Sequence, residues 1–107
     1  MGRQLQINAT SSYSYSGISL GRFANDTSNS GLDFVKSRSA TVGGNTIVQS
    51  GDSIGAIIFK CADGNDLLTP AAEIRADVDG TPGANDMPGR IRFSTTADGS
   101  NSLTELA

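Results

Sequence analysis

The 107-residue chain lacks several of the residue types on which catalysis and metal binding most often depend. It has no His and a single Cys, so one chain cannot supply the ligands of a structural zinc site or a Cys–His nucleophilic pair. Gly43-Gly44-Asn45 is not followed by the Lys and Ser or Thr of a phosphate-binding loop. We therefore expect no enzymatic activity and no bound cofactor or metal.

Material for a hydrophobic core is also scarce. The chain has no Trp, aromatic residues make up 6% of it, and hydrophobic residues make up 36%. Such a composition favours either partial disorder or a fold that other copies complete. A net charge of only −3, with apolar residues in short patterned runs, argues against disorder. We expect residues 1–107 to form one domain that is completed by oligomerisation.

Charge and apolar runs exclude two classes of partner. The pI is about 4.6 and the Lys and Arg residues do not cluster, so we expect no nucleic-acid binding. No apolar stretch is long enough to cross a bilayer, and residues 1–5 lack the apolar run of a signal peptide. We therefore expect no membrane insertion. Cys61 ends the apolar run 57–61, where we expect it to be a buried, small hydrophobic residue.

Short apolar runs that alternate with polar residues predict an all-β fold of short antiparallel strands joined by Gly and Asn turns. The predicted strands cover residues 5–7, 18–23, 32–38, 54–61, 73–78 and 89–93. The run 54–61 is the most apolar, and we expect it to be buried on both faces. Turns are predicted at Asn25-Asp26, Gly43-Gly44-Asn45, Asp63-Gly64-Asn65, Asp79-Gly80, Pro88-Gly89 and Asp98-Gly99.

The charges of two predicted strands are complementary. Glu73, Arg75 and Asp77 alternate with apolar residues on one strand, and Arg90 and Arg92 do so on the other. If the two strands are neighbours, these residues can form a cross-strand charge ladder on the outward face. Exposed ion pairs contribute only about 0.2–1 kcal/mol each, so we expect the ladder to set strand register more than stability.

The segment 79–89, between these two strands, is predicted to be an ordered surface loop. Proline has no N–H to donate and fixes φ, so the segment cannot be a ladder strand. A loop of this length is usually packed by its own side chains, and Met87 is the expected apolar anchor. The structural residues of the loop are Gly80, Pro82, Gly83, Asn85, Asp86, Met87, Pro88 and Gly89.

Two chemical alternatives involve carboxylates near this loop. Glu73, Asp77 and Asp79 share one side of an extended strand and could form the acid–base pair of a glycan hydrolase. Arg75 lies between the first two and should hold both ionised, which argues against that chemistry. Asp77 and Asp79 could also offer oxygens to Ca²⁺, with Asn85 and Asp86 nearby, but Asp-Gly and Asn-Asp are ordinary turn sequences, and we prefer that interpretation.

Four blocks of sequence carry a family resemblance. They are residues 36–38 (KSR), 48–55 (VQSGDSIG), 79–90 (DGTPGANDMPGR) and 93–100 (FSTTADGS). In this order and spacing they resemble a repeat of bacteriophage tail fibre and tail-associated structural proteins, marine phages included. The resemblance covers residues 36–105 and is weaker at 4–7 and 16–22. The chain ends Thr104-Glu105-Leu106-Ala107, where the repeat usually has Thr-Glu-Arg, which suggests a natural terminus or a cut fragment.

The resemblance implies a fibrous homotrimer. The chain would then be a structural segment of a virion tail fibre, made in the host cytoplasm, with flanking fibre segments as its other partners. Its strands would form a sandwich-like or an intertwined trimeric domain. The alternative function is recognition of a host-surface glycan through the loops. Tyr13 and Tyr15 are the candidate contacts, because their spacing puts both rings on one side of an extended segment, although a packed pair at a subunit interface is the preferred interpretation.

Overall fold

The computed structural model of the protein describes residues 4–10, 12 and 16–106. Contacts divide the chain into two units, residues 1–33 and residues 34–107, which are described separately. The second unit contains a four-stranded antiparallel sheet, and the described residues include no helix. The predicted all-β fold class is therefore confirmed.

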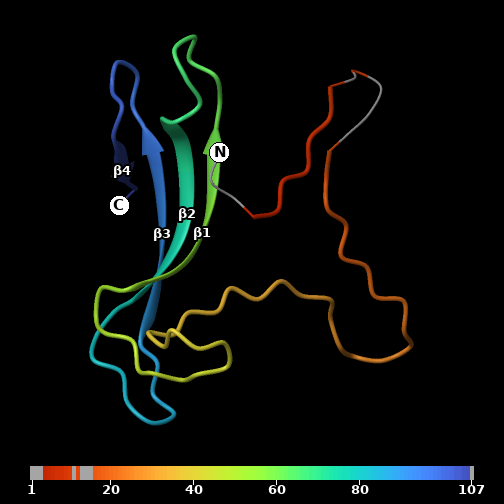
Figure 1. Cartoon of the computed structure of the whole chain (residues 1–107), viewed down its shortest axis with the longest axis vertical. Coiled ribbons are helices and arrows are strands. Elements are labelled where there is room, and N and C mark those ends of the chain that lie inside the picture. The colour runs from red at the N-terminus through yellow and green to blue at the C-terminus, as the bar shows by residue number, and fades with distance from the viewer. Residues whose placement is uncertain (1–3, 11, 13–15, 107) are drawn as a thin grey trace. The chain divides into compact units, whose positions relative to one another are not determined.

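The four strands of the sheet are neighbours in the order in which they occur along the chain (Figure 1). They are β1 (Ser53–Lys60), β2 (Pro70–Val78), β3 (Gly89–Thr96) and β4 (Leu103–Glu105). The first three lie where the alternation of apolar and polar residues predicts strands. The short strand β4 was not predicted, since three residues offer too little alternation, but it follows the predicted turn at Asp98-Gly99.

The register of β1, β2 and β3 places like residues side by side. Ile74 of β2 lies opposite Ile57 of β1 and Phe93 of β3, while Arg75 lies opposite Ala56 and Arg92. Since successive side chains of a strand point to opposite faces, the sheet has an apolar face and a face that is charged on β2 and β3, here called the polar face, to which β1 contributes Ala56 and Ile58. The prediction that 54–61 is buried on both faces is wrong, because β1 is an edge strand with much of its surface exposed.

The buried core of the second unit is small and lies at one end of the sheet. Val48 and Val78 are the buried hydrophobic residues of the described part of the chain, and Val78 is 2% exposed. The turn after Val48 is attached here, because the N–H of Gly51 donates to the Val78 carbonyl (2.8 Å) and the N–H of Val78 donates to the Asp52 carbonyl (2.9 Å). Pro82, from the loop between β2 and β3, is also buried.

Three predicted strands do not form. Within the described residues, the segments 5–7, 18–23 and 32–38 lie outside any strand. Alternation favours an extended backbone, but a strand also requires a neighbour whose N–H and C=O groups complete the ladder. Among the residues that the structure describes, none of these three segments is part of such a ladder.

The first unit consists of chain without strand or helix in its described residues. Arg22 forms an ion pair with Asp26, and the Asp26 carboxylate also accepts the N–H of Ser28 (3.0 Å). The Ser30 hydroxyl donates to the Leu20 carbonyl (2.8 Å), which closes a loop around this turn. The predicted turn at Asn25-Asp26 is therefore present, and the apolar side chains beside it remain exposed.

Candidate functional site

The polar face of the sheet holds two ion pairs. The guanidinium group of Arg75 donates from Nε and Nη2 to the two carboxylate oxygens of Glu73 (2.6 and 2.9 Å) and from Nη1 to the hydroxyl of Ser53 (2.6 Å). Arg92 of β3 donates from Nε to Asp77 of β2 (2.5 Å). The like charges of Arg75 and Arg92, directly opposite in the register, are each compensated by a carboxylate of β2.

The carboxylates of this face are more buried than expected. Glu73 and Asp77 are each 7% exposed, although the sequence predicts that the charged side of β2 points outward. That prediction is wrong because the two long arginine side chains lie over the carboxylates and cover them. The Arg75 guanidinium lowers the pKa of Glu73 below its ordinary value, although burial acts in the opposite direction. A general acid needs a raised pKa, so the glycan-hydrolase alternative receives no support from Glu73.

The charge ladder is only partly a cross-strand structure. Asp77 and Arg92 pair between β2 and β3, whereas Glu73 and Arg75 pair within β2. Arg90 lies directly opposite Asp77 in the register and is exposed. The Asp77 carboxylate accepts from Arg92, its diagonal neighbour, so the pairing skips the directly opposite position.

The opposite face of the sheet, here called the apolar face, has no cover over much of its area. Four of its side chains are 44% to 64% exposed: Ile57, Phe59, Ile91 and Phe93. Ile57 and Phe93 lie on either side of Ile74, whereas Phe59 lies opposite Ala72 and Ile91 lies opposite Ala76. The apolar face comprises Ile57, Phe59, Ile74, Ala76, Ile91 and Phe93.

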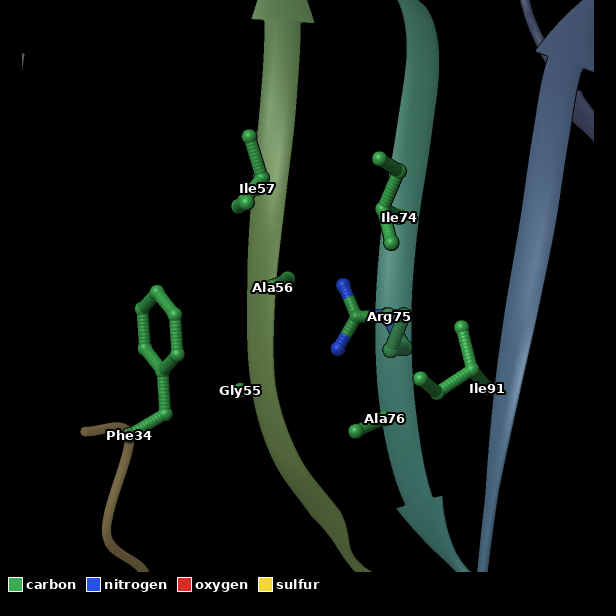
Figure 2. Close-up of a pocket in the computed structure, with 8 residues that line it drawn as sticks. All are labelled: Phe34, Gly55, Ala56, Ile57, Ile74, Arg75, Ala76 and Ile91. Carbon is green, nitrogen blue, oxygen red and sulfur yellow. The ribbon is translucent and has the colours of Figure 1, made fainter. Parts of the chain in front are cut away.

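A hollow of about 170 Å³ lies in the apolar face (Figure 2). It arises where small residues align across the strands, because Gly55 lies opposite Ala76, and Ala76 lies opposite Ile91. The ring of Phe34 stands beside β1 at the rim. A Cβ atom added to Gly55 would lie 2.6 Å from the Phe34 Cβ and 2.8 Å from its Cγ, so only glycine permits this approach.

The loop between β2 and β3 is ordered by backbone hydrogen bonds. Gly83 and Asp86 exchange two of them (3.0 and 3.1 Å) around Asn85, whose φ is 55°. The predicted apolar anchor is wrong. Met87 is exposed, while Pro82 is the buried residue of the loop.

Gly80, Pro88 and Gly89 complete the ends of this loop. Gly80 has φ 128°, a backbone conformation that favours glycine, and its N–H donates to the Ser50 hydroxyl (3.2 Å). The Pro88 carbonyl accepts the N–H of Asp79 (3.0 Å), and Gly89 begins β3 opposite Val78. The loop therefore joins two adjacent strands as a long hairpin connection.

Sequence reasoning missed an ion pair that closes the segment 38–52, directly before β1. Arg38 donates from Nε and Nη2 to the two oxygens of Asp52 (2.7 and 2.8 Å), and the N–H of Gln49 donates to the same carboxylate (3.0 Å). These hydrogen bonds lower the pKa of Asp52 well below its ordinary value. The two residues belong to different blocks of the resemblance, and no local pattern links them.

Sequence reasoning also missed a Gly-x-Ser-x-Gly pattern at Gly51-Asp52-Ser53-Ile54-Gly55, the spacing of a hydrolase nucleophile elbow. The structure does not give it that form. Ser53 begins β1 instead of lying on a turn between a strand and a helix, and its hydroxyl accepts from Arg75. The chain also has no His to act as the base.

Other predicted sites can now be placed. Cys61 is exposed, so its predicted burial is wrong; it follows the last residue of edge strand β1. Tyr13 and Tyr15 lie outside the described residues, and their role in glycan contact stays a prediction. Among the described residues, no group of three or more His, Cys, Asp or Glu side chains could hold a metal ion, and no helix could span a membrane.

No protein-family model matches the chain, and no curated protein matches it.

Proposed function

We propose that this chain is a structural segment of a homotrimeric fibre of the bacteriophage tail-fibre type. The observation that carries the proposal is the disproportion between buried and exposed apolar side chains. Val48 and Val78 form the buried hydrophobic core of the described residues, while eighteen large hydrophobic residues in the same ranges are exposed. A soluble monomer rarely leaves so much of its apolar surface in water.

The arrangement of the exposed apolar side chains also supports a hydrophobic core that several copies of the chain form together. On the sheet it is one continuous face, and in the first unit it follows extended chain at Ile18, Leu20 and Phe23. Other copies can supply the ladders and the packing that these segments lack within one chain. Glu73, Arg75, Asp77 and Arg92 are already paired within the chain, so these four charges need no partner from another copy.

The assignment to tail fibres rests on the resemblance of residues 36–105. This region nearly coincides with the second unit, residues 34–107, so the resembling blocks belong to one structural unit. The blocks 48–55, 79–90 and 93–100 supply the turn before β1, the loop between β2 and β3, and the second half of β3. The blocks therefore lie mostly in the turns and loops that connect the strands, and β2 lies outside them.

The test is the mass of the purified chain in solution, measured by light scattering behind a sizing column. We expect three times the chain mass of 11.0 kDa. The mass should persist on dilution over at least tenfold, because a core shared by three chains makes a stable interface. A folded particle with the mass of one chain would refute the proposal.

A further inference from the structure

The apolar face of the sheet has the features of a contact surface for a second copy of the chain. Ile57, Phe59, Ile91 and Phe93 each leave roughly half of their surface in water. With about 150–250 Å² available on a phenylalanine, the four exposed side chains together present on the order of 400 Å². This is about half of the roughly 800 Å² per partner of a stable interface, enough for its apolar centre with a polar rim around it.

The hollow in this face has the size of an aromatic side chain. Its volume is about 170 Å³, and cavities of about 150 Å³ lined by apolar side chains accept a benzene ring. Gly55 and Ala76 form its floor, and Phe34 and Ile91 lie at its edges (Figure 2). The same face presents Phe59 and Phe93, so each chain offers both a hollow and rings that can fill one.

The charges of the sheet favour a copy of the same chain over a charged partner. The side chains that the register places on the apolar face are uncharged. Arg75, which also lines the hollow, is paired with Glu73, so two such faces can meet without repulsion between like charges. Glu73, Arg75, Asp77 and Arg92 lie on the other face and are paired there. A partner of opposite charge would therefore find no attraction on the apolar face.

We infer that the apolar face is the surface through which copies of this chain associate, and that a phenylalanine of one copy occupies the hollow of the next. In a ring of three chains this contact is heterologous, with the hollow of each chain filled by its neighbour. The inference rests on the proposed function, because it names the surface that self-association would use.

Two substitutions test the surface in different ways. Phe93→Ser removes one exposed ring, while Ala76→Leu fills the hollow without making the face less apolar. We expect each to raise the dissociation constant of the assembly about tenfold or more, measured by sedimentation equilibrium over a range of concentrations. Leu68→Ser is the matched control, because Leu68 is exposed but lies outside the sheet, and it should leave the constant unchanged.

The outcomes separate this inference from the proposed function. A wild-type chain that stays monomeric at all concentrations would refute the proposed function and the inference with it. A wild-type trimer that both variants retain with unchanged affinity would refute the apolar face as the contact while leaving self-association in place. Far-UV circular dichroism checks that each variant keeps its sheet, and Ala76→Leu decides the matter if Phe93→Ser unfolds.

Discussion

Phe34 lies so close to Gly55 that replacing this glycine even by alanine should destabilise the fold. A Cβ atom in Gly55→Ala would lie 2.6 Å from the Phe34 Cβ and 2.8 Å from its Cγ. Carbon atoms in favourable contact are about 3.5–4.0 Å apart, so either Phe34 or β1 must move. Overpacking of this kind costs about 1–3 kcal/mol, and replacing a strand glycine by alanine returns about 0.5–1 kcal/mol.

We therefore expect Gly55→Ala to lower the free energy of unfolding by about 1 kcal/mol, within the range of about 0–2.5 kcal/mol that these two effects leave. The measurement is urea unfolding followed by circular dichroism, at one protein concentration and with the oligomeric mass checked for each variant. Gly83→Ala is the matched control, because a Cβ atom there meets nothing within 4 Å. It should change the free energy of unfolding by less than about 0.5 kcal/mol.

A double-mutant cycle isolates the contact itself. Phe34→Gly removes both of the atoms that a Cβ at position 55 would strike. In that background Gly55→Ala should be neutral or stabilising by about 0.5–1 kcal/mol, which gives a coupling energy of at least about 1 kcal/mol. An equal effect of Gly55→Ala in both backgrounds would show that the penalty has another source, and would refute the role of Phe34.

Two further predictions concern the core and the ion pairs. Val78→Ala truncates a buried side chain at the end of β2 and should lower the free energy of unfolding in urea by about 2–3 kcal/mol. Val42→Ala, at a fully exposed position, should lower it by less than about 0.5 kcal/mol. Equal losses in the two variants would contradict this placement of the core. Folding lowers the pKa of Asp52 and of Glu73. The stability that these carboxylates contribute is therefore complete above their ordinary pKa values near 4, and it is lost as the pH falls through their lowered pKa values in the folded chain. The urea concentration at the unfolding midpoint should therefore be constant above pH 5 and decrease below about pH 4. Asp52→Asn should be less stable than the wild type at pH 7 and should lose less stability on acidification. The same dependence of the midpoint on pH in both proteins would exclude Asp52 as a contributor.

Much of the sheet could be predicted from local sequence patterns. Local patterns identify all three strands, because β1 lies in the most apolar run, 54–61, and β2 and β3 lie in the alternating runs 73–78 and 89–93. The segments 5–7, 18–23 and 32–38 have similar alternation and form no strand within the single chain. Alternation shows which side chains would share a face if a segment were a strand. It does not show whether another segment lies beside it to complete the backbone hydrogen bonds.

The candidate site was only partly predictable. The charged residues of β2 and β3 were correctly placed on one face, since register follows from the connecting loop and the alternation. The burial of that face was not predicted, because it depends on how Arg75 and Arg92 lie over Glu73 and Asp77. The predicted burial of Met87 is wrong for a similar reason, because the apolar character of a loop residue does not show whether its side chain is buried in the folded chain.

By itself the sequence determined the all-β class, the positions of three strands, and the division of β2 and β3 into a polar and an apolar side. These follow from local composition and from the period of a strand. Only the tertiary structure decided that Arg38 binds Asp52, that Phe34 packs against Gly55, and that the apolar face is left open while the charged face is covered. Those contacts join residues far apart in the chain, so they depend on which segments meet in space.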